Sequence, residues 1–152
     1  MRKEIEKLLQ SVQKPARYAG GELNSVMKDK SKVALRYAFC FPDTYEIGMS
    51  HLGMKILYGV ANAREDTWCE RVFAPADDME ALMRANGEPL FALESGDPIK
   101  DFDMIGFTMQ YELSYTNILN MLDLAGVPLR AEDRKSLTPI VAFGGPCACN
   151  PE

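Results

Sequence analysis

The stretch ALRYAFCFPDTYEIGMSHLGMKILYGV, residues 34–60, decides the fold. Residues 34–41 form a continuous apolar and aromatic run, which is typical of a strand buried on both faces of a sheet. Pro42 and Asp43 end this run, and from Ser50 onward apolar residues recur at helical spacing, with Ser50 as the expected N-cap. The stretch therefore predicts a buried strand followed by a helix.

The same alternation continues along the chain. Further strands are predicted over 67–75, 89–95, 104–110 and 139–145, and further helices over 1–13, 77–87 and 111–126. Gly87 and Gly126 are expected to end the last two helices. Strands that alternate with helices form right-handed βαβ units. The sequence therefore predicts an α/β fold of the flavodoxin or Rossmann type, with a parallel sheet of about five strands flanked by helices.

Composition excludes several classes of protein. The chain has 152 residues, 47% of them apolar and 26% charged, with a formal net charge of -5. These values fit one globular domain and argue against disordered and fibrous proteins. No basic cluster occurs, so nucleic-acid binding is not expected. No apolar run approaches the roughly 20 residues of a membrane-spanning helix, and the charged start MRKEIEKLLQ does not resemble a signal peptide. We therefore expect a cytoplasmic protein with reduced cysteines.

The cysteines and the histidine do not predict a metal site. Cys40 lies in an apolar run, where it is expected to be a small buried side chain. Cys147 and Cys149 form a C-x-C pair, but a zinc site would need a second pair of ligands, and His51 is the only histidine. The chain also lacks the C-x-x-x-C-x-x-C and G-x-S-x-G motifs. No catalytic residue is therefore predicted in it.

Three loops are candidate binding sites, because ligands of parallel sheets bind at the carboxyl ends of the strands. They follow the predicted strands 34–41, 104–110 and 139–145. The candidate binding residues in and beside these loops are Asp43, Tyr45, Gly48, Ser50, His51, Thr108, Gln110, Gly144, Gly145 and Pro146.

Each loop also has a structural interpretation. Gly48 either leaves room for a ligand or permits close packing of a helix on a strand. Gly144 and Gly145 either allow another body to approach the backbone or form a tight turn. Gln110 and its neighbours can orient a ligand or cap the next helix. The chain lacks the dinucleotide and P-loop motifs, which leaves a small nucleotide or flavin site at the helix start near Ser50 as an alternative.

Together the three loops resemble the cobalamin-binding domain, which carries D-x-H-x-x-G, S-x-L and G-G after the corresponding strands. Here Asp43 to Gly48 match the first motif with Tyr45 at the histidine position, Thr108-Met109-Gln110 replaces S-x-L, and Gly144-Gly145 matches the third. The resemblance implies a corrin over the strand ends and a nucleotide tail beside the glycines. The phenol of Tyr45 stays protonated at neutral pH and is a poor cobalt ligand, so the resemblance implies cobalamin binding without a histidine ligand to cobalt.

A closer resemblance extends over most of the chain. It rests on KPARYAGGELN, FPDTYEIGMSHLGMKILYG, WCERVFAP, LESGDPIKDFDMIGFTMQYELSYTNILNMLDLAG and GGPCACNPE. These segments resemble the N-terminal region of radical S-adenosylmethionine (radical SAM) proteins, with Cys147 at the histidine place of G-G-P-H-A-x-x-P-E. The resemblance implies a parent protein whose C-terminal domain holds a [4Fe-4S] cluster and S-adenosylmethionine. That domain is absent from this chain and is its expected partner in cis.

Two hypotheses follow for the division 1–33, a helix and lead-in loop, and 34–152, a cobalamin-binding-like domain. In the first, the domain positions cobalamin or substrate for a radical SAM enzyme and is not itself catalytic. In the second, it is a degenerate, cofactor-free docking domain of the same parent. Because no helix follows the last predicted strand, we expect a domain truncated at the C-terminus, with apolar surface exposed. The sequence does not indicate the substrate, the reaction or the oligomeric state.

Overall fold

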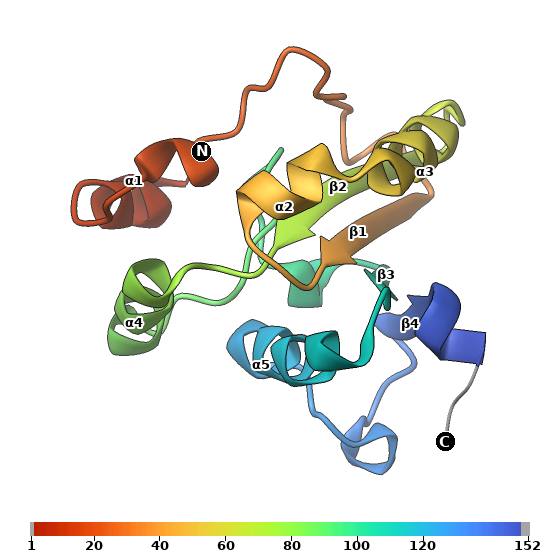
Figure 1. Ribbon diagram of the computed structural model, residues 1–152. Coiled ribbons are helices and arrows are strands. Elements are labelled where there is room, and N and C mark those ends of the chain that lie inside the picture. Colours follow the sequence, from red (N-terminus) through yellow and green to blue (C-terminus); the bar gives the residue numbers. More distant parts are fainter. Residues whose placement is uncertain (1, 150–152) are drawn as a thin grey trace.

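The computed structural model, which describes residues 2–149, contains one sheet of four parallel strands. The strands are β1 (Leu35–Phe41), β2 (Thr67–Phe73), β3 (Met104–Thr108) and β4 (Ile140–Gly144), in the order β2-β1-β3-β4 (Figure 1). The helices are α1 (Lys3–Leu9), α2 (Tyr45–Ser50), α3 (Leu52–Asn62), α4 (Asp77–Asn86) and α5 (Tyr115–Ala125). The predicted parallel α/β fold is confirmed, with one strand fewer than expected.

Helices cover both faces of the sheet, as parallel strands require. On one face α2 and α3 pack over β1 and β2, where Phe39 and Phe41 contact Met54 and Tyr58. On the other face α1, α4 and α5 enclose the larger core. Gly87 and Gly126 end α4 and α5 with φ of 66° and 71°, as predicted. Across the described part of the chain, none of the helices has the length and apolar character that a membrane span needs.

The predicted strand over 89–95 is wrong, because this segment covers the edge of β2 mainly with side chains. The N–H of Leu93 donates to the carbonyl of Arg71 at 2.8 Å, as in a sheet. The next contacts are different: the Glu94 carboxylate accepts the Arg71 backbone N–H at 2.7 Å, and the Ser95 N–H donates to the Glu70 carboxylate at 2.9 Å. The backbone N–H and carbonyl of Arg71 at this edge are thus hydrogen-bonded without a fifth strand.

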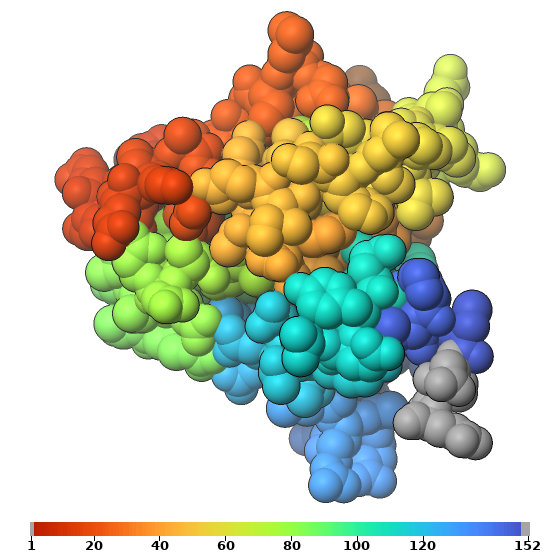
Figure 2. Space-filling view, viewed as in Figure 1, coloured from red at the N-terminus to blue at the C-terminus, as the bar shows by residue number. Residues whose placement is uncertain are grey.

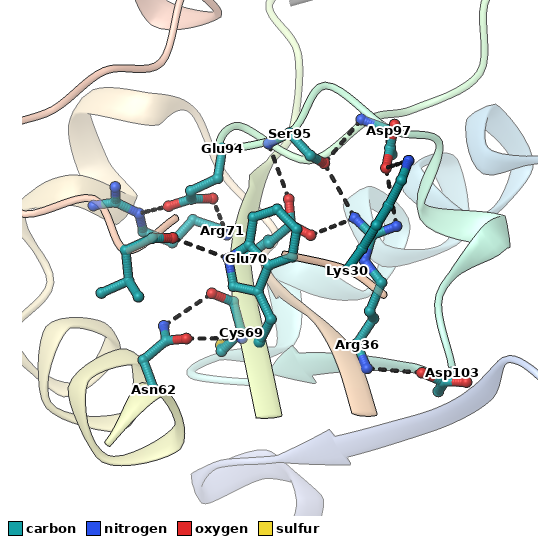
Figure 3. Close-up of polar contacts among 12 residues, drawn as sticks. Lys30, Arg36, Asn62, Cys69, Glu70, Arg71, Glu94, Ser95, Asp97 and Asp103 are labelled. Carbon is teal, nitrogen blue, oxygen red and sulfur yellow. Dashed lines mark hydrogen bonds and ion pairs between the residues drawn. The ribbon is translucent and has the colours of Figure 1, made fainter. Parts of the chain in front are cut away.

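The residues that cover the edge of β2 belong to a network of buried charged side chains (Figure 3). The Arg71 Nε–H donates to Glu94 Oε1 at 2.6 Å, and Arg36 donates to Glu70 Oε1 at 2.5 Å. The Glu70 and Glu94 side chains are fully buried. Burial raises the pKa of the Glu94 carboxyl, although Arg71 acts in the opposite direction. This network ties the segment after α4 to the sheet.

The expected N-cap at Ser50 is also wrong. Residues 45–50 are already helical, and α3 begins after a break at His51. His51 Nδ1 accepts the N–H of Met54 at 3.1 Å, which is the bond of an N-cap, while the Ser50 hydroxyl donates back to the Glu46 carbonyl at 2.6 Å. The imidazole of His51 is thus the N-cap of α3.

Candidate functional site

The reversal of strand order lies between β1 and β3, because β1 has β2 on one side and β3 on the other. A ligand of such a sheet is expected at the carboxyl ends of these two strands. Asp43 follows β1, and Thr108 ends β3, with Gln110 hydrogen-bonded to it. The Tyr111 hydroxyl donates to Asp43 Oδ2 at 3.5 Å and connects the two loops. Asp43 and Thr108 thus lie at the ends of two paired strands, and Thr108 contacts Gln110; their part in ligand binding stays a prediction.

An open cavity of about 620 Å³ adjoins this point, at the ends of β1 and β2. Asp43 and Thr44 line it, together with side chains from the lead-in segment, α4 and α5; these include Lys14, Arg17, Asp77, Asp78, Asn117 and Asn120. Its lining is polar and carries both signs of charge. Such a surface suits a polar ligand with several hydrogen-bonding groups.

Several side chains that line this cavity are fixed by hydrogen bonds within the protein. Asp78 accepts the backbone N–H of Gln13 at 2.8 Å, and this bond contributes most to lowering the pKa of Asp78. Arg17 donates to Glu46 at 2.9 Å. The lead-in segment thus forms one wall of the cavity. Lys14 and Arg17 were not among the predicted binding residues, because nothing in the pattern of residues 14–17 places them beside the strand ends.

Tyr45, predicted at the cobalt-facing position, points to the lead-in segment. Its hydroxyl donates to Glu22 Oε1 at 3.1 Å, and its ring packs edge-on against Phe73, with the ring centroids 5.5 Å apart. Burial, followed by the charge of Glu22, raises the pKa of Tyr45. The phenol is therefore a protonated donor that already has an acceptor, and it is a poor metal ligand.

Gly48 lies against the sheet, and its environment supports the packing interpretation. A Cβ at this position would lie 2.3 Å from Cε1 of Phe73, which is closer than real Cβ contacts allow. Ser50 and His51 lie in the same helical segment, where both side chains bond to backbone. Tyr45, Gly48, Ser50 and His51 therefore have structural roles in α2 and at the start of α3; their part in cofactor binding remains a prediction.

Gly144, the last residue of β4, and Gly145, which follows it, differ from one another. Gly145 has φ of 113°, and a Cβ there would lie 2.6 Å from the carbonyl oxygen of Met109. The Met109 N–H donates to the Gly144 carbonyl at 2.6 Å, so the two loops are bonded. Gly144 has no atom within 4 Å of its own Cβ position. Gly145 thus permits a tight turn against Met109, whereas Gly144 faces open space.

A second hollow, of about 490 Å³, lies beside this turn. Its lining is mostly apolar and includes Met109, Tyr115, Val141, Phe143 and Cys147. Pro146 begins the 3-10 turn η5 (Pro146–Cys149), which forms part of its wall. Gly144, Gly145 and Pro146 are therefore grouped at the end of β4.

We expect Gly145→Ala to lower the free energy of unfolding by about 1–3 kcal/mol, because alanine would combine an unfavourable φ with a clash against Met109. The matched control is Gly144→Ala, which meets no atom and should change stability little. Urea denaturation of the two variants measures the difference. Equal effects at the two positions would contradict this interpretation of the turn.

The residues at the strand ends do not fit a histidine-ligated cobalamin. Tyr45 replaces the histidine and is bonded to Glu22, while the positions beside Gly48 and Gly145 are filled by Phe73 and Met109. Among residues 2–149 there is also no group of three or more His, Cys, Asp or Glu side chains placed to hold a metal ion.

Comparison with known proteins identifies the family. The family model described as "Radical SAM proteins, N-terminal" matches residues 53–152, which is most of the chain. No curated protein and no solved structure matches the chain. The match confirms the radical SAM part of the resemblance, and it implies a [4Fe-4S] cluster and S-adenosylmethionine in the parent protein. The chain belongs to the family of N-terminal regions of radical SAM proteins.

Proposed function

We propose that this domain is a cofactor-free positioning and docking module of a radical SAM iron–sulfur enzyme. One observation carries the choice: the chain's own atoms fill the places beside Gly48 and Gly145 that a cobalamin tail would need. The contact between Tyr111 and Asp43 across the two loops agrees with it. The cluster and S-adenosylmethionine would supply the chemistry from another domain of the parent protein, in cis.

In this proposal the polar cavity of about 620 Å³ holds part of the substrate. Asp43 and Asp77 would accept hydrogen bonds from it, and the amides of Asn117 and Asn120 can donate or accept. The Asn117 amide already donates to the Pro42 carbonyl at 2.9 Å, which fixes its orientation toward the end of β1. These groups favour a polar substrate with several hydroxyl or amine donors.

Cobalamin bound without a histidine ligand is the second candidate. The observation in its favour is the apolar hollow of about 490 Å³ beside β4 and η5. Phe143, 47% exposed, and Met109 could contact the face of a large ring there. In this case the domain would position the cofactor for the parent enzyme and would itself remain non-catalytic.

Hydroxocobalamin added to the full-length parent protein separates the two candidates. We expect it to elute apart from the protein in gel filtration and to leave the melting temperature unchanged. Co-elution of one equivalent per chain would contradict the cofactor-free proposal. If that equivalent were lost in Ala148→Trp, which places an indole in the hollow, but kept in Leu137→Trp, an exposed position elsewhere, the second candidate would replace the first.

A further inference from the structure

Helix α3 is apolar on its outer side as well as its inner side. Met54 and Tyr58 point into the core and are almost fully buried. Leu52, Ile56 and Val60, spaced by four residues, lie on the opposite side and are 68%, 54% and 63% exposed. In Figure 2 the yellow atoms of α3 form an uncovered band on the face in view. A helix that is apolar all round is normally buried by further protein.

The edge strand β4 is incompletely covered on the same side of the sheet. Phe143 stacks on Phe107 of the α5-side core, and side chains alternate along a strand, so Ile140 and Ala142 point to the side of α3. Ile140 is 55% exposed, and within the described residues α2 and α3 lie over β1 and β2 (Figure 1). Parallel sheets are almost always covered on both faces. Because β3 is buried along most of its length, the incompletely covered part of this layer is β4.

These two features lie on the same side of the sheet. Asn62 marks the flank of α3 nearest β2, because its side chain exchanges two hydrogen bonds with the backbone of Cys69. Leu57 lies on the opposite flank, toward β3, and is 55% exposed. The apolar side chains exposed on this side of the sheet, with the half-buried Ala142, are here called the α3–β4 surface; they are Leu52, Ile56, Leu57, Val60 and Ile140.

We infer that the α3–β4 surface is the face on which the radical SAM domain of the parent protein docks. The inference rests on the proposed docking function and assigns it a place on the molecule. In this family the domain studied is N-terminal, so its radical SAM partner follows in the sequence. The chain leaves the sheet through η5, which contacts β4, and a partner tethered there is held beside the surface at high effective concentration. Two free copies, each of net charge -5, lack this advantage and repel one another.

Photo-crosslinking in the full-length parent protein tests the inference. The photoreactive residue p-benzoylphenylalanine is placed at Val60, and the matched control carries it at Leu137, which is 88% exposed on a connection outside the surface. We expect Val60 to crosslink within the same chain to peptides of the radical SAM domain, and Leu137 not to. A crosslink from Val60 to a second copy, or none to the radical SAM domain, would overturn the inference.

A second measurement follows the coupling of the two domains during unfolding. If the two domains dock here, the parent protein should unfold in one thermal transition, and Ile56→Glu combined with Val60→Glu should split it into two, whereas Leu137→Glu should not. Both substituted side chains are more than half exposed, so an unchanged circular dichroism spectrum will verify that the domain still folds. An unsplit transition in the double variant would contradict docking at this surface. The cobalamin titration is independent of both measurements, so failure of the proposed function is recognised separately.

Discussion

Replacing Arg71 by methionine should lower the free energy of unfolding by about 3–5 kcal/mol, the largest effect that we expect from a single substitution. Only 3% of the Arg71 side chain is exposed, and it donates to Glu94 at 2.6 Å and to Glu22 at 3.3 Å. Methionine would fill much of the volume but would leave the Glu94 carboxylate buried without its cation. The loss of stability comes from this buried carboxylate, which has lost its cation.

The loss should grow with pH. Burial already raises the pKa of Glu94, and removing Arg71 would raise it further. A carboxyl whose pKa is higher in the folded state contributes stability below its unfolded pKa and loses that contribution as pH rises through the folded pKa. Arg71→Met should therefore be less damaging at pH 5 than at pH 8.

Urea denaturation at both pH values measures this effect, with Arg130→Met as the matched control, because Arg130 forms an exposed pair with Glu132. The control should leave stability unchanged. Combining Arg71→Met with Glu94→Gln should recover most of the loss, since a neutral amide needs no cation and its oxygen can still accept the backbone N–H of residue 71. A loss below about 1 kcal/mol for Arg71→Met at pH 8 would show that Glu94 finds another partner or water.

The second large effect is expected at Lys28, where methionine should cost about 2–4 kcal/mol. The ammonium of Lys28 donates to three backbone carbonyls, those of Asn62 at 2.9 Å, Arg64 at 2.5 Å and Thr67 at 2.6 Å. These carbonyls lie at the end of α3 and the start of β2, where the helix leaves its last acceptors unpaired. A cation there also offsets the negative end of the helix dipole.

Lys32→Met is the matched control for this prediction, because Lys32 pairs only with the neighbouring Asp29 and is 80% exposed. Chemical denaturation should show a clear loss for Lys28→Met and almost none for the control. Hydrogen exchange adds a local measurement: amides in the last turn of α3 should exchange faster in Lys28→Met alone. Similar stability of the two variants would show that water replaces the ammonium.

The sequence predicted the elements that depend on local pattern. Apolar runs located β1, β2, β3 and β4, and the left-handed conformation of Gly87 and Gly126 followed from their position after helical periodicity. The common edge of the three binding loops also followed, because the carboxyl ends of parallel strands lie together.

The errors arose where side chains replace backbone contacts. PLFALES has the apolar character of a strand, but Glu94 and Ser95 bond to β2 through one side chain and one N–H that no periodicity reveals. The same holds for His51, whose imidazole caps α3 in place of the expected hydroxyl of Ser50. Charged residues are normally exposed, so the burial of Glu70, Arg71 and Glu94 gave no signal in composition.

The candidate binding residues stay a prediction. Asp43 and Thr108 lie at the ends of the paired strands β1 and β3, whereas the direction of the Tyr45 side chain depends on α2 beginning at that residue. The roles of Gly48 and Gly145 also became clear only from the structure. The sequence alone does not show whether a glycine leaves space for a ligand or for side chains and backbone of the same chain, here Phe73 and Met109.

The strand order also constrains how the protein forms during synthesis. The central strand β1 is made first, and it can pair with β2 soon afterwards. Its other neighbour is β3, in which Met104 aligns with Tyr37, so this edge of β1 stays open until the ribosome has passed residue 104. Pairings so distant in sequence form slowly. A nascent chain that ends within α4 therefore presents a two-stranded ribbon with one bare apolar face, which is a form that chaperones recognise.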